Sequence, residues 1–96
     1  MAVKPKGRFL KITEYSNWCY YDRLGGVDLK DDEKLEIEWP NGQHTRVTVR
    51  LREFSTPYQD HSHPTSIPHK EAYCKIMHKG HPIKVRLVGL KARRIQ

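Results

Sequence analysis

The sequence predicts a mainly β protein, built as a small antiparallel barrel or sandwich of five to seven short strands. Apolar and polar residues alternate with a period of two at residues 35–39 and again at residues 47–52, as they do in strands with one buried face. Turn residues separate short apolar runs along the chain, a pattern typical of small all-β domains. A chain of 96 residues has room for one domain.

We expect residues 1–7 to form a flexible tail and residues 8–96 to form a single β domain. The tail is polar and basic, and terminal segments of this kind are usually poorly ordered. Beyond the two alternating runs, further strands are expected at residues 8–14, 18–24 and 89–95.

The segment EIEWPNGQHTRVT, residues 36–48, contains a turn between the two alternating strands. A two-residue turn at Asn41-Gly42 would place Ile37 opposite Arg46, so an apolar side chain would share a face with a charge. A three-residue turn that begins at Pro40 avoids this conflict. Proline suits the first position of such a turn, and glycine suits the left-handed position that ends it.

The three-residue turn fixes the register of the whole hairpin. It places Leu35 opposite Val47 on the buried face and Glu36 opposite Arg46 on the other face. Opposite charges that face each other across two strands stabilise a sheet. We therefore expect a positive φ angle at Gly42 and a largely neutralised outer face on this hairpin.

Residues 72–88 predict a second hairpin with its turn at Lys79-Gly80. Ile76 would then face Ile83, and on the other face Lys75 would lie opposite Lys84. An alternative remains open for the first half of this segment, because Gly80 is also suited to ending a helix. In that case residues 68–79 would form one helix, and the fold would be α+β.

Between the two hairpins, residues 53–71 predict a long loop that is stiffened by prolines. His61 and His63 lie two residues apart next to Asp60, a spacing that allows a metal ion to be chelated in an extended segment. No paired cysteines and no HExxH motif accompany them. We therefore expect a polar loop with no metal and no cofactor.

Catalytic and membrane motifs are also missing from the sequence. It has no glycine-rich phosphate loop and no GxSxG motif, and Cys19 and Cys74 lie in apolar surroundings typical of buried free thiols. No apolar run approaches the ~18 residues of a membrane span, and the N-terminus lacks the apolar stretch of a secretion signal. The sequence predicts a cytoplasmic protein that is not an enzyme.

The net charge of +7 is unevenly distributed. Residues 1–48 are balanced, whereas residues 70–96 contain eight basic residues and one acid, Glu71. This asymmetry indicates an anionic partner, either nucleic acid or an acidic protein surface. The second hairpin and the C-terminal strand supply the candidate nucleic-acid-binding residues, which are Tyr73, Lys75, Lys79, Lys84, Arg86, Lys91, Arg93 and Arg94.

At the level of architecture, the chain resembles small SH3-like barrels. The resemblance rests on the WPNG hairpin, the long connection, the second hairpin and the short strand after Gly89. Such barrels bind nucleic acids or peptides or support assembly, so the resemblance does not select one function. The alternative to nucleic-acid binding is a protein-interaction module or a small homo-oligomer. The short, basic chain is also typical of proteins encoded by phages or mobile elements.

Overall fold

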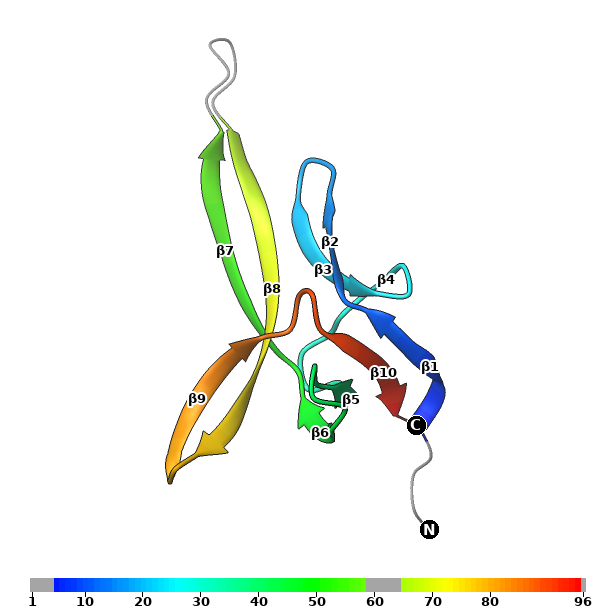
Figure 1. Cartoon of the computed structure of the whole chain (residues 1–96). Helices are drawn as coiled ribbons and strands as arrows, with labels where there is room; N and C mark the ends of the chain where they lie inside the picture. The colour runs from blue at the N-terminus through cyan, green and yellow to red at the C-terminus, as the bar shows by residue number, and fades with distance from the viewer. Residues whose placement is uncertain (1–4, 59–64, 96) are drawn as a thin grey trace.

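A computed structural model describes residues 5–58 and 65–95, which form ten strands and no helix (Figure 1). The all-β prediction of a small barrel or sandwich is therefore confirmed. The alternative helix at residues 68–79 is wrong, because these residues lie in a strand and its turn. The strands are β1 (Pro5–Lys11), β2 (Thr13–Ser16), β3 (Tyr20–Leu24), β4 (Val27–Asp28), β5 (Lys34–Glu38), β6 (His44–Thr48), β7 (Arg50–Tyr58), β8 (Thr65–His78), β9 (His81–Arg86) and β10 (Lys91–Ile95).

The strands form two sheets. One sheet has the order β1-β10-β5-β6, and the other has the order β2-β3-β8-β7, with β4 paired to β3 and β9 paired to β8. All pairs are antiparallel except β3 with β8, which is parallel. The described part of the chain contains no helix long and apolar enough to cross a membrane.

Two bends carry the chain from one sheet to the other. Ile12 separates β1 from β2, and Val49 separates β6 from β7; both side chains are buried. Main-chain hydrogen bonds fix each bend. The Ile12 N–H donates to the Leu90 carbonyl at 2.8 Å, and the Val49 N–H donates to the Glu33 carbonyl at 2.7 Å. Each bend thus directs an apolar side chain into the space between the sheets.

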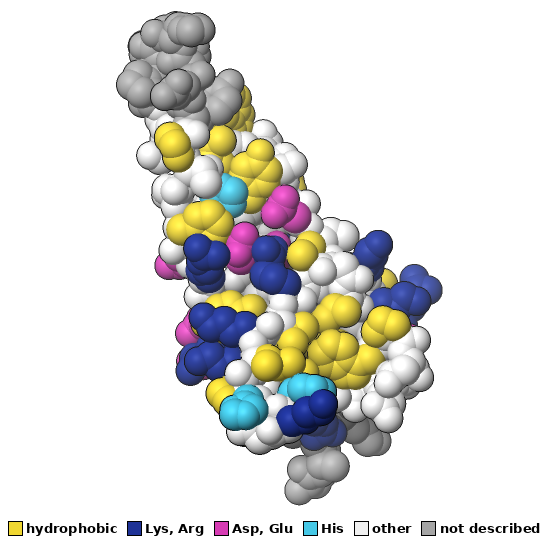
Figure 2. Space-filling model, turned by 60° about the vertical axis from the view of Figure 1, so that its left-hand side comes forward, with side chains coloured by type: hydrophobic (Ala, Val, Ile, Leu, Met, Phe, Trp, Pro, Cys, Tyr) yellow, Lys and Arg dark blue, Asp and Glu magenta, His cyan; other side chains and the backbone are white. Residues whose placement is uncertain are grey.

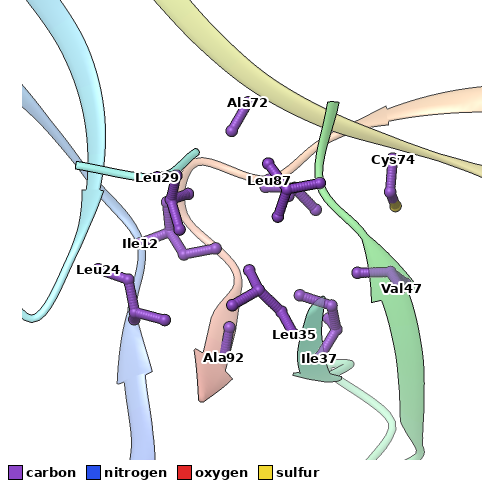
Figure 3. Close-up of a cluster of buried hydrophobic side chains, with 11 residues drawn as sticks. Ile12, Leu24, Leu29, Leu35, Ile37, Val47, Ala72, Cys74, Leu87 and Ala92 are labelled. Carbon is purple, nitrogen blue, oxygen red and sulfur yellow. The ribbon is translucent and has the colours of Figure 1, made fainter. Parts of the chain in front are cut away.

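The core lies where the two sheets meet, and Figure 3 shows its buried side chains pointing toward one another from both sheets. Leu35 and Ile37 come from β5, Ala72 and Cys74 come from β8, and Leu87 comes from the turn that precedes β10. All five are 0% exposed. The core therefore depends on residues that are distant in the sequence.

The predicted register of the first hairpin is confirmed. Leu35 pairs with Val47 and Glu36 pairs with Arg46, and Gly42 has a φ angle of 87°. The Trp39 N–H donates to the Gln43 carbonyl at 2.8 Å, which closes the three-residue turn.

The register of the second hairpin is confirmed as well. Ile76 pairs with Ile83 and Lys75 pairs with Lys84. Lys79 and Gly80 form the turn with φ angles of 51° and 78°. Two consecutive positive φ angles give the turn type whose twist matches that of the adjoining strands.

The structure corrects the loop that was predicted at residues 53–71. Described residues 53–58 lie in β7 and residues 65–71 lie in β8, and the two strands pair from Arg50–Tyr73 to Tyr58–Thr65. They form a long two-stranded arm that projects from the core (Figure 1). The radius of gyration is accordingly 15.4 Å, against about 12.5 Å for a compact chain of this length.

The number of strands and the start of the first strand also differ from the predictions. The structure has ten strands rather than five to seven. The bends divide what would otherwise be long strands, and residues of the predicted loop belong to the strands of the arm. The predicted flexible tail at residues 1–7 extends too far, since β1 begins at Pro5. Residues 1–4 lie outside the described part of the chain.

Candidate nucleic-acid interface

The predicted site residues divide into two groups on different sheets. Tyr73, Lys75, Lys84 and Arg86 lie on β8 and β9, with Lys79 in the turn between them. The remaining candidates, Lys91, Arg93 and Arg94, lie on β10 in the other sheet.

Strand alternation places Tyr73, Lys75, Lys84 and Arg86 on one face of the β8–β9 hairpin. Neighbouring residues of a strand point to opposite faces, and the intervening Cys74 is buried in the core. Tyr73 is paired with Arg86 and Lys75 with Lys84, so the four side chains form two adjacent cross-strand pairs. We call these four residues the basic face. The side of the molecule that is turned forward in Figure 2 carries basic and hydrophobic side chains next to one another.

Lys75 and Lys84 form the centre of the basic face. Both are exposed, and among the described residues no carboxylate is in ion-pair contact with either ammonium group. The Lys84 Nζ lies 5.1 Å from the centroid of the Tyr73 ring, which is within the range of a cation–π contact. Like charges directly opposite each other destabilise a sheet, and a bound anion relieves that repulsion.

Arg86 has two acidic partners, although Glu71 is the only acid in residues 70–96. Its guanidinium contacts Asp22 Oδ2 at 3.3 Å and Glu71 Oε1 at 3.0 Å. Asp22 lies 64 residues earlier in the chain, so its proximity could not be inferred from local sequence. Arg86 is therefore held in place by acids beside the basic face.

Asp22 is itself an unusual buried acid. Its Oδ2 accepts a hydrogen bond from the Ala72 N–H at 2.7 Å, and its Oδ1 is buried with no hydrogen-bond partner among the described atoms. Burial raises the pKa of the Asp22 carboxyl above its ordinary value; the Ala72 hydrogen bond and the Arg86 charge oppose this shift. Asp22 thus connects β3 with β8 and β9 through a single oxygen.

The arginines of β10 also have structural partners. Arg93 donates to Glu36 Oε1 at 2.8 Å, and its guanidinium lies 4.3 Å from the centroid of the Phe9 ring. Arg94 pairs with Glu33 and donates to the Leu24 carbonyl at 2.7 Å. These contacts tie β10 to neighbouring segments, and only Lys91 remains an exposed base on this strand.

A groove beside the basic face was not predicted from the sequence. It has a volume of about 780 Å³ and lies between the turn after β5 and the end of β8. Trp39 and Met77 supply apolar walls, and Arg46 and Lys75 supply positive charge. Met77 is 69% exposed. The high exposure of this large apolar residue beside two bases marks the groove as a second candidate binding surface.

The arm carries a three-ring stack that the sequence analysis also missed. The His69 ring lies 4.4 Å from the Phe54 ring and 4.7 Å from the Tyr20 ring, measured between centroids. The His69 Nε2 is 2.9 Å from the Thr56 hydroxyl. One histidine that had been placed in a loop therefore connects β3, β7 and β8.

The histidines and cysteines that were considered in the sequence can be placed only in part. His61 and His63 lie outside the described residues. Within the described residues, no group of three His, Cys, Asp or Glu side chains is arranged to hold a metal ion. Cys74 is buried as predicted, and burial raises the pKa of its thiol. Cys19 is only half-buried, and both cysteines are free.

Comparison of the chain with protein-family models, with curated proteins and with solved structures gave no match. The assignment of a function therefore rests on the geometry and charge of the residues described above.

Proposed function

We propose that this protein is a non-enzymatic module that binds nucleic acid through the basic face. The observation that carries the proposal is the pair of exposed lysines, Lys75 and Lys84, which lie opposite each other without a carboxylate in ion-pair contact among the described residues. Phosphates would bind to these lysines. Tyr73, beneath Lys84, offers a ring on which an unpaired base can stack.

The structural contacts narrow the set of residues proposed to bind. Lys79 at the hairpin turn and Lys91 on β10 are the two further exposed lysines proposed to contact phosphates. Arg86, Arg93 and Arg94 have the structural role described above, because each contacts carboxylates of the protein itself. The cytoplasmic location stays a prediction from the sequence.

The salt dependence of binding tests this proposal. A labelled oligonucleotide should bind the protein at low salt, and the slope of log K against log salt should decrease by about 1.4–1.8 in the Lys75→Glu/Lys84→Glu variant, which lacks two phosphate contacts. Most of the affinity should be lost, while the thermal unfolding curve keeps its shape. The measurement is fluorescence anisotropy across a salt series.

The matched control for this experiment is Lys30→Glu/Lys34→Glu, which makes the same change in net charge at two exposed lysines that are paired with none of the proposed binding residues. The control should retain most of the affinity. Equal losses in the two double variants would show that bulk charge alone is responsible. Unchanged binding in the Lys75→Glu/Lys84→Glu variant would refute the site.

A protein-interaction module or homo-oligomer is the second candidate function. The observation that favours it is the arm, which projects from the core and offers a partner a surface outside the packed sheets (Figure 1). Sedimentation equilibrium distinguishes the two candidates. A monomer at all concentrations that binds nucleic acid supports the first, and a stable oligomer without nucleic-acid affinity supports the second.

A further inference from the structure

One edge of β8 is left open near its end. β7 pairs with β8 only as far as Tyr73, which faces Arg50, because the chain bends away at Val49. Residues 74–78 of β8 keep β9 on one edge. On the other edge the described residues place no paired strand, and we call this segment the open edge of β8.

The direction of the main-chain groups at the open edge follows from the register. The Leu87 N–H donates to the Ala72 carbonyl at 3.1 Å, so Tyr73 and Arg86 between them form a pair without mutual hydrogen bonds. Such pairs alternate with hydrogen-bonded pairs along antiparallel strands. Lys75 and Met77 therefore direct both their N–H and their C=O away from β9, toward the open edge.

Proline blocks two other exposed edges but not this one. Pro82 lies opposite Met77 in a pair without mutual hydrogen bonds, so its missing N–H faces the outer edge of β9. Pro57, opposite Ser66, occupies the corresponding outward position on β7. Prolines at such positions prevent another strand from pairing. Residues 74–78 of β8 contain no proline, and their edge can accept a strand.

The chemistry of the groove indicates what kind of strand fits. The open edge forms part of the groove, whose lining includes Arg46 and Lys75 as basic residues and no acidic residue. Trp39 and Met77 provide apolar contacts. The unpaired edge offers donors and acceptors in alternation. A peptide main chain supplies both, whereas the phosphodiester backbone of a nucleic acid supplies acceptors only.

We propose that the open edge of β8 binds an extended, acidic peptide segment of a partner protein by strand addition. The peptide main chain pairs with Lys75 and Met77, and its acidic side chains face Arg46 and Lys75. Its apolar side chains contact Trp39. Lys75 belongs to both this surface and the basic face, but strand addition uses its main chain, whereas the proposed phosphate contact uses its ammonium group. Main-chain pairing with a peptide and binding of nucleic acid can therefore fail independently.

The probe for this site is a short synthetic peptide of alternating Glu and Val, added to isotope-labelled protein up to about 1 mM, the concentration range of weak binding. We expect NMR shifts at the Lys75 and Met77 amides and at the Trp39 indole, and slower hydrogen exchange at the two amides. A peptide with Lys in place of Glu should produce at least fivefold weaker binding. Absence of shifts at the open edge, or equal binding of both peptides, would overturn the proposal.

Two proline variants test the role of the main chain. Met77→Pro removes an N–H that points to the open edge and is not used in pairing with β9. Ser55→Pro removes an equivalent outward N–H from β7, opposite Pro68. The first should weaken peptide binding at least fivefold, and the second should leave it unchanged. Equal effects of the two variants on peptide binding would contradict strand addition. If Met77→Pro fails to fold, hydrogen exchange at the Lys75 and Met77 amides of the unmodified protein, with and without peptide, tests the same main-chain pairing.

Discussion

Asp22 holds the side chain of Arg86 in its orientation at the basic face. Its carboxyl is buried, one oxygen is hydrogen-bonded to the Ala72 N–H, and Arg86 approaches from β9. Without Asp22, Glu71 would be the one carboxylate within the described ranges that still pairs with the Arg86 guanidinium. The orientation of Arg86 beside Lys84 thus depends on an acid from the N-terminal half of the chain.

The raised pKa of Asp22 makes a prediction about stability and pH. A carboxyl whose pKa is higher in the folded state favours folding most when it is protonated. Its contribution is therefore complete below the ordinary value of 3.8 and is lost as the pH rises through the raised value. Asp22→Asn does not ionise. Relative to the unmodified protein, this variant should gain stability as the pH rises from 3.8 toward neutrality, by about 1.4 kcal/mol for each unit of pKa shift.

Urea denaturation of both proteins across this pH range measures the difference. Subtraction of the two curves cancels the other carboxyl groups, which are common to both proteins. The quantity of interest is the unfolding free energy of Asp22→Asn minus that of the unmodified protein. If it stays constant or falls as the pH rises, the pKa of Asp22 is not raised in the folded state.

Residue-level pairing could be predicted from the sequence only where the partners lie on one hairpin. The register of Glu36 with Arg46 followed from alternation and the turn at Pro40. The contacts of Arg93 with Glu36 and of Arg94 with Glu33 follow instead from the position of β10 beside β5. Nothing in the local pattern of KARRI indicates which strand it will pair with.

At the scale of elements, the arm explains why proline misled the prediction. Pro57 and Pro68 favoured a loop because proline weakens most strands. In the structure each occupies a position whose main-chain nitrogen points away from the strand paired with it across β7 and β8. The absent N–H therefore costs no hydrogen bond within this pair, and the strands continue through both prolines.

The arm should be the least stable element of the described chain. A two-stranded ribbon is marginal in water when it has no apolar face to bury, and its outer part lacks core residues. Amide hydrogen exchange should therefore become faster from Arg52 through Phe54 to Thr56. His69→Ala removes ring contacts worth about 0.5–1.5 kcal/mol each and should accelerate exchange in the arm.

The amides of β5 and β6 are the internal reference for this exchange experiment, because their hairpin contributes Leu35, Ile37 and Val47 to the core. They should keep their exchange rates in the His69→Ala variant. Uniform protection along the arm, or equal acceleration in β5 and β6, would disprove local instability of the arm.

At the scale of the whole molecule, the two bends determine how the sheets close around the core. The sequence predicted the alternating strands and the class of fold, since these depend on local periodicity. It did not predict the bends at Ile12 and Val49, because both residues lie in runs that look like ordinary strand. What distinguishes them is hydrogen bonding to distant segments, Leu90 and Glu33. The groove and the open edge of β8 are consequences of the second bend.

The turn that precedes β10 should be as important to stability as the strands. Leu87 is 0% exposed and points into the centre of the core (Figure 3). Leu87→Ala should lower the free energy of unfolding by about 2–5 kcal/mol, since it removes buried contacts and leaves a cavity. That is a large part of the ~5–15 kcal/mol typical of a small domain.

Val27→Ala, at a side chain that is 54% exposed, is the control and should change stability by no more than about 0.5 kcal/mol. Chemical denaturation followed by Trp fluorescence measures both. Similar losses in the two variants would mean that the core does not extend to Leu87, and that the sheets are held together by their strands alone.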